Sequence, residues 1–266
     1  MLIMITSRCH MDCPHCMQDA GPGGRHMTDE TFDEVMDLCR EAQPWVVSLT
    51  GGEPTEHPRW REMARELLAL PSVKILTILT NGAWIDDTKE RLKMARLIRD
   101  GKTSKKKLMV QVYSHPRYYQ DHEWTVEHEQ QFRAIGCQPN FTDPIFMQDL
   151  GRARENCQEE TAASDHVPSC INSHLLAVQA RSLQHFLLMA AQAGKFCRPL
   201  IDPDGAVHMS ESWLCPAVAR VSDGAPEVFR QMRRSRPCRG CRLYRNFEQL
   251  HPKELQVLEN PILMKL

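Results

Sequence analysis

Three cysteines near the N-terminus have the types and spacing of a metal-binding loop. Cys9, Cys13 and Cys16 lie within eight residues of one another. Thiolates bind zinc and iron–sulfur clusters in preference to harder metals. A 4Fe–4S cluster normally takes four cysteines, so three at this spacing would leave one iron free to bind another ligand. Zinc is the main alternative, because His10 or His15 could complete a site of three cysteines and one histidine.

Two further segments carry unusual residues, and each follows a predicted strand. Gly51–Pro54 has the sequence GGEP and comes after the apolar run at residues 46–49. Asn81 and Gly82 come after a strand predicted at residues 74–80. Glycine has no Cβ, so a ligand can approach the backbone closely at GGEP. We expect both segments and the cysteine loop to face one pocket, because functional residues lie at the carboxyl ends of parallel strands.

The elements that must position these loops are predicted by hydrophobic periodicity. Runs of strand length alternate with segments of helical period from residue 2 to about residue 141. The predicted strands are residues 2–6, 46–49, 74–80, 108–113 and 138–142, and the predicted helices are residues 28–40, 60–68, 86–99 and 126–135. Thr31 with Glu34 predicts a capping box at the start of the first helix. This alternation predicts βαβ units, a parallel sheet and an α/β fold, open or closed into a barrel.

Composition limits the cellular setting. The chain has 266 residues, 33 basic and 34 acidic side chains and a net charge of −1, which gives no overall attraction to nucleic acid or to an anionic membrane. No apolar run approaches the roughly 18 residues of a membrane span, and residues 1–5 indicate a strand and not a signal peptide. We therefore expect a cytoplasmic protein. Eleven cysteines in that compartment indicate metal binding or catalysis before disulfides.

Some cysteines have no ligand spacing. Cys39 lies on the apolar face of a predicted helix and is expected in the core, and Cys137 and Cys157 have no partner cysteine nearby. Cys170 could be a ligand, a redox-active thiol or a buried residue.

The C-terminal part has a different pattern. A long helix is predicted at residues 173–193, and the turn Asp202–Gly205 predicts a hairpin of residues 198–201 and 206–209. Four cysteines accompany it: Cys197, Cys215, Cys238 and Cys241. Four thiolates are enough to saturate one further 4Fe–4S cluster, and a structural zinc ion is the alternative.

The joint pattern of C-x3-C-x2-C after the first strand and GGEP after the second resembles the radical S-adenosylmethionine (radical SAM) superfamily, over roughly residues 1–155. The resemblance implies a partial (β/α)6 barrel. It also implies a 4Fe–4S cluster on Cys9, Cys13 and Cys16, whose open iron is chelated by the amino and carboxylate groups of SAM. The backbone of Gly51, Gly52, Glu53 and Pro54 would meet the methionine amino group.

Further cofactor-binding positions follow from the same resemblance. His15 stands where the family often has an aromatic residue near the adenine, and Gln111 and Ser114 match a region that touches the SAM ribose or carboxylate. Asn81 completes the predicted cofactor-binding residues. The sequence Gly-Arg-Ala at residues 151–153 resembles an element that often follows the late strands in peptide-modifying members.

The C-terminal cysteines resemble the auxiliary-cluster extensions known as SPASM and twitch domains. The pattern departs from SPASM because Ser210 stands where a cysteine is usual, and no cysteine follows Cys241. We therefore expect one auxiliary 4Fe–4S cluster, a radical SAM core at residues 1–165 and a small cysteine-rich domain at residues 166–266.

The resemblance implies an enzyme that cleaves SAM reductively and abstracts hydrogen from a substrate, with an electron donor such as flavodoxin or ferredoxin. A peptide or protein side chain is the expected substrate, because members with auxiliary clusters commonly modify peptides. A small molecule or nucleotide is the alternative. A metal-binding module without turnover belongs to another class, and GGEP argues against it, because such a module has no use for a SAM site.

Overall fold

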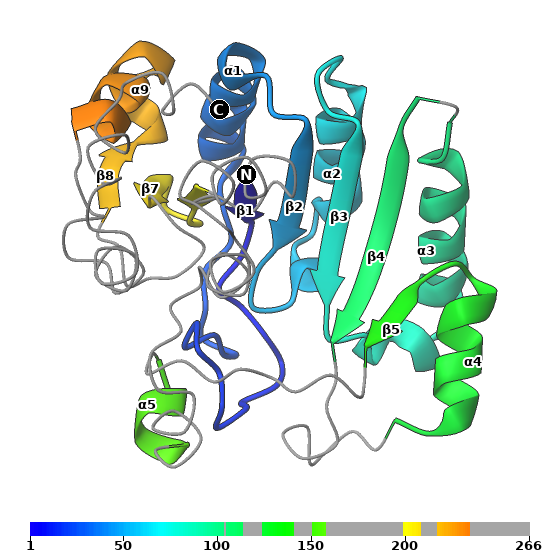
Figure 1. Ribbon diagram of the computed structural model, residues 1–266. Helices are drawn as coiled ribbons and strands as arrows, with labels where there is room; N and C mark the ends of the chain where they lie inside the picture. Colours follow the sequence, from blue (N-terminus) through cyan, green and yellow to red (C-terminus); the bar gives the residue numbers. More distant parts are fainter. Residues whose placement is uncertain (104, 114–123, 141–150, 158–198, 209–216, 235–266) are drawn as a thin grey trace, which may run out of the picture.

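The computed structural model describes residues 1–103, 105–113, 124–140, 151–157, 199–208 and 217–234 (Figure 1). The strands are β1 (Leu2–Met4), β2 (Val46–Thr50), β3 (Ile75–Thr80), β4 (Lys107–Tyr113), β5 (Gln138–Asn140), β6 (Leu200–Ile201), β7 (Ala206–His208) and β8 (Ala217–Arg220). The α-helices are α1 (Asp29–Ala42), α2 (Trp60–Ala69), α3 (Thr88–Asp100), α4 (Val126–Ala134), α5 (Ala153–Asn156) and α9 (Ala225–Arg234). Short 3-10 helices are η1 (Pro54–Glu56), η2 (Ala83–Asp86) and η3 (Val221–Asp223). Within these ranges no helix is both long and apolar enough to cross a bilayer.

The described strands form a sheet in the order β5-β4-β3-β2-β1-β6-β7-β8. Neighbours from β5 through β1 to β6 run parallel, whereas β7 is antiparallel to β6 and to β8. The predicted α/β fold with a largely parallel sheet is therefore confirmed. Because the parallel strands point the same way, the loops after β1, β2 and β3 gather at one edge, the lower edge in Figure 1.

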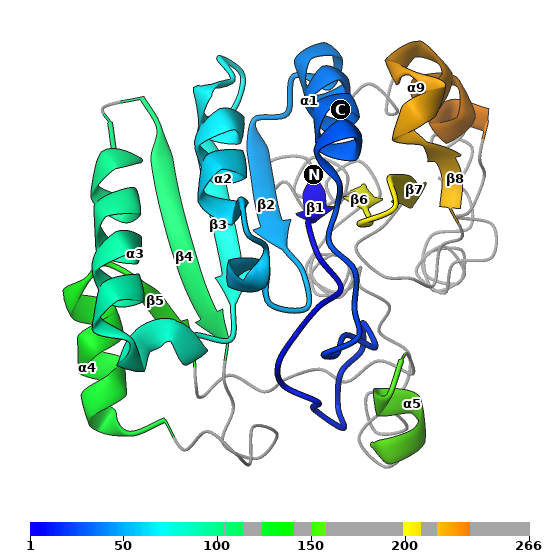
Figure 2. The same ribbon diagram turned by 180° about the vertical axis from the view of Figure 1, so that it is seen from behind.

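One face of the sheet carries a helical layer. Helices α1 to α4 lie over this face (Figure 2), and α9 packs beside α1. The strand residues that pack into this core are apolar: Ile3, Val47, Leu49, Leu76, Ile78, Leu108, Val110, Val112, Ile201 and Val207. Successive side chains of a strand point to opposite faces, so Ser48, Thr50 and Thr77 belong to the other face. The sheet thus presents buried hydroxyl groups on the side away from these helices.

Helix α1 begins where a threonine side chain caps it. Thr28 has an extended backbone, and its hydroxyl accepts a hydrogen bond from the Thr31 N–H at 3.2 Å. The capping box expected from Thr31 and Glu34 is wrong, since Thr31 already lies in the first helical turn. Asp29 and Glu30 follow the cap in the first turn, where their negative charges stabilise the helix by interacting with the positive end of its dipole.

The hairpin predicted at residues 198–209 is present as β6 and β7, and β6 pairs with β1. The Asp202 carboxylate accepts hydrogen bonds from the N–H groups of Asp204 and Ala206 at 2.9 and 2.8 Å, which fixes the turn. Arg25 pairs with Asp204 at 2.6 Å and so links this turn to the segment after the cysteine loop. The sheet is therefore continuous across the boundary expected between residues 165 and 166, and that division stays a prediction.

Candidate functional site

The loops after β1 and β2 are hydrogen-bonded to each other at the carboxyl edge of the sheet. The N–H of Gly52 donates to the carbonyl of Thr6 at 2.7 Å, and the N–H of Glu53 donates to the carbonyl of Arg8 at 2.9 Å. GGEP therefore pairs with the chain directly before Cys9. The structure brings together these two motifs, as the sequence predicts.

The two glycines after β2 are required by this contact between loops. A Cβ on Gly51 would lie 2.7 Å from the carbonyl oxygen of Thr6, and a Cβ on Gly52 would lie 2.4 Å from that of Arg8. Such distances are far below ordinary contact distances, so any larger residue would push the loops apart. These glycines thus allow the loop after β2 to lie directly against the backbone of the segment before Cys9.

The buried carboxyl group of Glu53 joins the loop after β2 to the loop after β3. Its Oε1 accepts from the N–H and hydroxyl of Thr55 at 3.1 and 2.6 Å and from the hydroxyl of Thr80 at 2.8 Å, and its Oε2 accepts from the N–H of Asn81 at 2.8 Å. Burial raises the pKa of Glu53, and these hydrogen bonds oppose that rise. All four groups donate, so they favour the carboxylate. The sequence does not point to Thr55 or Thr80. Their partner, Glu53, lies within the GGEP motif itself and is 27 residues away from Thr80.

The side chain of Asn81 reaches from the end of β3 into the cysteine loop. Its Nδ2 lies 3.1 Å from the sulfur of Met11 and 3.9 Å from the sulfur of Cys9. Its Oδ1 accepts a hydrogen bond from the N–H of Ala83 at 2.9 Å, which fixes the orientation of the amide. The third loop therefore contacts the first, and Asn81 lies beside a predicted metal ligand.

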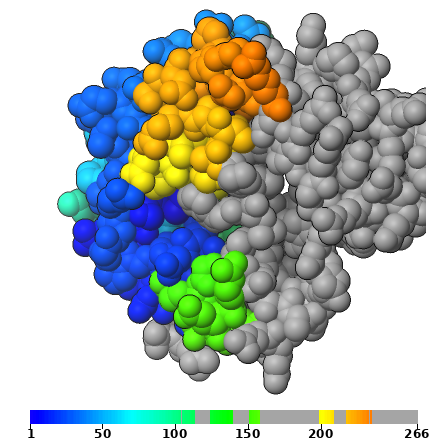
Figure 3. Space-filling view, turned by 90° about the vertical axis from the view of Figure 1, so that its left-hand side faces the viewer, coloured from blue at the N-terminus to red at the C-terminus, as the bar shows by residue number. Residues whose placement is uncertain are grey.

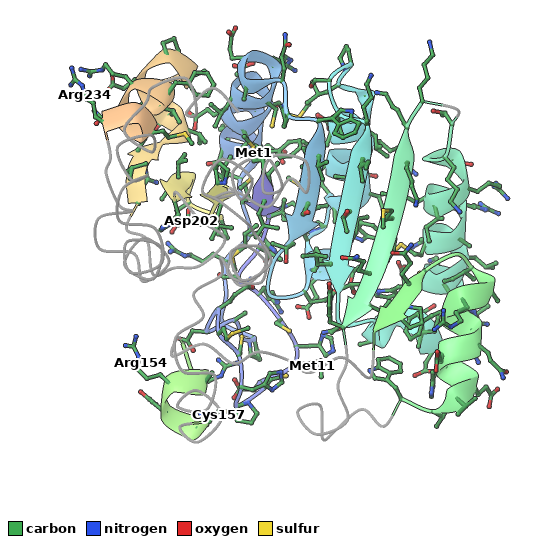
Figure 4. The ribbon with its side chains drawn as sticks, in the orientation of Figure 1. Met1, Met11, Arg154, Cys157, Asp202 and Arg234 are labelled. Carbon is green, nitrogen blue, oxygen red and sulfur yellow. The ribbon has the colours of Figure 1, made fainter. Side chains whose placement is uncertain are left out.

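The three thiols lie in one apolar cluster below the strands. Cys13 and Cys16 pack against a buried group that contains Cys9 and Met11, and Met11 is labelled in Figure 4. Burial raises the pKa of Cys9 to about 12 and that of Cys13 to about 11, and neighbouring thiols add to both shifts. Three thiolates in one largely buried group are unstable without a compensating cation, because burial disfavours the charged form. The donor set therefore fits a metal centre, whose binding displaces the thiol protons.

A histidine that could complete a zinc site has another partner. His10 donates its backbone N–H to Glu56 at 2.5 Å, and its ring Nδ1 lies 2.5 Å from the same carboxylate oxygen. The ligand atoms of Cys9, His10 and Glu56 lie within 4.8 Å of one another, but this group excludes Cys13 and Cys16. Recruiting His10 as the fourth ligand of the three cysteines would therefore cost its contact with Glu56.

Three further residues predicted to bind the cofactor lie within the described chain, and they differ in how they are placed relative to the cysteine loop. His15 is buried inside the cysteine loop, where burial and the charge of Arg152 lower its pKa to about 4. Pro54 is buried and begins η1. Gln111 lies half-buried on β4 and accepts a hydrogen bond from the hydroxyl of Tyr113 at 3.3 Å. Within the described chain, no hydrogen bond is seen between Gln111 and the cysteine loop.

Several predicted residues cannot be placed. Ser114, Cys170, Cys197, Ser210, Cys215, Cys238 and Cys241 lie outside the described residues. Cys39 is buried in the main hydrophobic core, as expected. Cys137 is buried in the same core, and Cys157 packs against Ala153.

A parallel α/β sheet with a three-cysteine loop at its carboxyl edge defines the class of protein. The sequence profile of the Radical SAM superfamily matches residues 3–135, which is half of the chain. The chain belongs to the radical SAM superfamily. It is an enzyme of this type, with a 4Fe–4S cluster and SAM as cofactors.

The chain is also similar to several curated proteins over part of its length. It is 35% identical over 101 residues to the GTP 3′,8-cyclase of Moorella thermoacetica, a match that covers 36% of this chain and 31% of that protein. It is 31% identical over 101 residues to the GTP 3′,8-cyclase of Listeria welshimeri, with 36% and 30% covered. The matched segment spans less than a third of either relative.

Solved structures agree on the fold. The structure of native anSMEcpe with bound AdoMet and a peptide has a TM-score of 0.52 and 11% sequence identity, and the match covers 89% of this chain and 80% of that one. At this identity the likeness concerns the fold alone.

Proposed function

We propose that Cys9, Cys13 and Cys16 hold the SAM-binding 4Fe–4S cluster of this enzyme, and that it abstracts hydrogen from a small molecule or nucleotide. The observation that carries the proposal is the hydrogen-bond network that joins GGEP, the end of β3 and the cysteine loop. Gly52 and Glu53 bind the cysteine loop and the end of β3, and Asn81 returns from β3 to Cys9. Gly52, Glu53 and Asn81, which the sequence assigns to SAM, thus contact the loop that carries the three cysteines.

The protein contributes positioning and a dry site. When bound, the cluster and SAM supply a one-electron cleavage that yields methionine and a 5′-deoxyadenosyl radical. Cys9 and Glu53 are almost completely buried, so the loops exclude water from this side of the centre. With the Glu53 side chain committed to Thr55, Thr80 and Asn81, the backbone of Gly51–Pro54 is the part of this loop that would meet the methionine group. His15, Gln111 and Ser114 are proposed as further SAM contacts.

The substrate class is proposed from the curated relatives. The sequence alone favours a peptide or protein side chain, whereas the matching relatives are GTP 3′,8-cyclases and so favour the alternative of a small molecule or nucleotide. The buried hydroxyls of Ser48, Thr50 and Thr77 line the sheet face opposite the helices and suit a polar ligand.

A second cluster and the remaining architecture are also proposals. Cys197, Cys215, Cys238 and Cys241 would saturate one auxiliary 4Fe–4S cluster in a SPASM- or twitch-like domain. The six parallel strands would form the partial (β/α)6 barrel of the family. A cytoplasmic setting and a flavodoxin or ferredoxin as electron donor complete the proposal.

Transfer of deuterium tests the substrate class. Uniformly deuterated cell extract would be divided into a nucleotide and metabolite pool and a peptide and protein pool. Each pool would be given to the reduced holoenzyme with unlabelled SAM. We expect 5′-deoxyadenosine one mass unit heavier with the first pool, because the abstracted hydrogen ends in that product. The Cys13→Ala variant is the control. Label that arises from the peptide pool alone would instead establish a peptide maturase.

A further inference from the structure

The segment at residues 151–157 packs against the cysteine loop, although it is more than a hundred residues away in the sequence. Residues 151–157, which include α5, lie against the N-terminal loop in Figures 1 and 3. The backbone N–H of Arg152 donates to the carbonyl of Cys16 at 3.0 Å. Its guanidinium donates to the carbonyl of Cys13 at 3.0 Å through Nε and to that of Ala20 at 2.6 Å through Nη2. One residue therefore binds three carbonyls of the loop, two of them on predicted cluster ligands.

Acidic side chains complete the surroundings of this arginine. Its Nη1 lies 3.1 Å from a carboxylate oxygen of Asp19 and 3.3 Å from one of Asp12. The side chain of Arg152 is 22% exposed, whereas those of Asp12 and Asp19 are 74% and 69% exposed. The two carboxylates are largely exposed, so water screens them more than it screens the guanidinium.

The residues beside Arg152 fix how the segment docks. Gly151 has a φ of +50°, and a Cβ there would lie 2.6 Å from the carbonyl oxygen of Cys16. Asn156, one turn further on, donates its side-chain N–H to the carbonyl of Pro14 at 3.2 Å. Gly151, Arg152 and Asn156 therefore all lie against the backbone of residues 13–16.

We propose that Arg152 is a positioning residue that shapes the cluster-binding loop and places a fixed positive charge beside the cluster. The proposal rests on the proposed function, because it needs the cluster on Cys9, Cys13 and Cys16. An arginine suits the role, since its planar fork holds five N–H donors at fixed and separated positions, whereas a lysine gathers its three donors on one nitrogen.

The two parts of this role have separate consequences. Residues that orient metal ligands without touching the metal typically change metal affinity roughly 10- to 100-fold when they are replaced. Loss of the hydrogen bonds should therefore speed loss of iron. Loss of the charge should lower the reduction potential of the cluster, because reduction adds an electron to an already negative centre.

Replacement of Arg152 by Met and by Lys separates these effects. Anaerobic holoprotein would be challenged with an iron chelator, and the potential would be followed by EPR titration of the signal that responds to SAM. We expect Arg152→Met to lose iron roughly 10-fold faster or more and to show a lower potential. Arg152→Lys should lose iron faster as well but keep a potential near that of the wild type. Arg133→Met removes an arginine that pairs with Glu129 on α4 and should match the wild type in both measurements.

The outcomes distinguish this proposal from the function on which it rests. Wild-type iron retention and potential in both Arg152 variants would overturn the proposal while the cluster assignment stands. Faster iron loss in Arg152→Met at an unchanged potential would overturn its electrostatic part. A wild-type protein without an EPR signal that responds to SAM would instead overturn the proposed function. Circular dichroism of each variant verifies that it is folded.

Discussion

Replacing Cys9, Cys13 and Cys16 together by Ala should abolish formation of 5′-deoxyadenosine. These thiols lie in one buried cluster, and no other cysteine of the described chain packs there. Without them no iron at this place can accept SAM. Anaerobic, reconstituted and reduced protein would be incubated with SAM, and the product would be quantified by mass spectrometry.

The iron content of the same variant tests the proposed second cluster. About four irons should remain per chain if Cys197, Cys215, Cys238 and Cys241 form an auxiliary 4Fe–4S centre. Cys39 and Cys137 provide a matched control, since both are buried in the main core away from the loop. Their joint replacement by Ala should leave turnover of SAM in place. Zinc in place of the residual iron would contradict the auxiliary cluster, and turnover by the triple variant would contradict the site.

Replacing Glu53 by Gln should weaken both the protein and its SAM site. The carboxyl group accepts four hydrogen bonds, and the amide can reproduce only those at one of its two oxygens. The amide NH2 would then face the N–H of Asn81 or the donors of Thr55 and Thr80. A buried donor left without an acceptor costs about 1–3 kcal/mol, so the free energy of unfolding should fall by about that amount. Denaturant unfolding of the metal-free protein measures this, and SAM cleavage should fall in parallel.

Glu41→Gln is the matched control, because Glu41 is an exposed residue near the end of α1. The same change of charge there should leave unfolding and SAM cleavage near the wild-type values. An unfolding free energy of Glu53→Gln equal to that of Glu41→Gln would show that the Glu53 network does not hold the loops together.

The fold could be predicted largely because its elements are periodic. The buried residues of helix α1 recur at helical spacing. Strands β3 and β4 are rich in Val, Ile and Leu, because most of their side chains are buried in the sheet. The cap of α1 is Thr28 and not Thr31, because both residues are capping residues by type and only the backbone conformation decides between them. The pairing of β6 with β1 joins segments almost two hundred residues apart, and local pattern carries no signal for it.

The candidate site could be predicted to the level of its motifs. The spacing of Cys9, Cys13 and Cys16 and the GGEP sequence identify the loops, because the chemistry depends on residue type. The hydrogen bonds between the loops could not be read from the chain. Thr80 contacts Glu53 across 27 residues, and Arg152 contacts Cys13 across 139, so their roles depend on three-dimensional packing. The glycines of GGEP are likewise required by the backbone of the cysteine loop, which only the folded chain brings beside them.

Cleavage of SAM by the wild-type protein tests the central claim most directly. The chain would be reconstituted with iron and sulfide without oxygen, reduced, and supplied with SAM alone. We expect 5′-deoxyadenosine and methionine to appear in equal amounts and only in the presence of reductant. Protein that carries a reducible 4Fe–4S cluster on its cysteine loop and yet leaves SAM intact would contradict it.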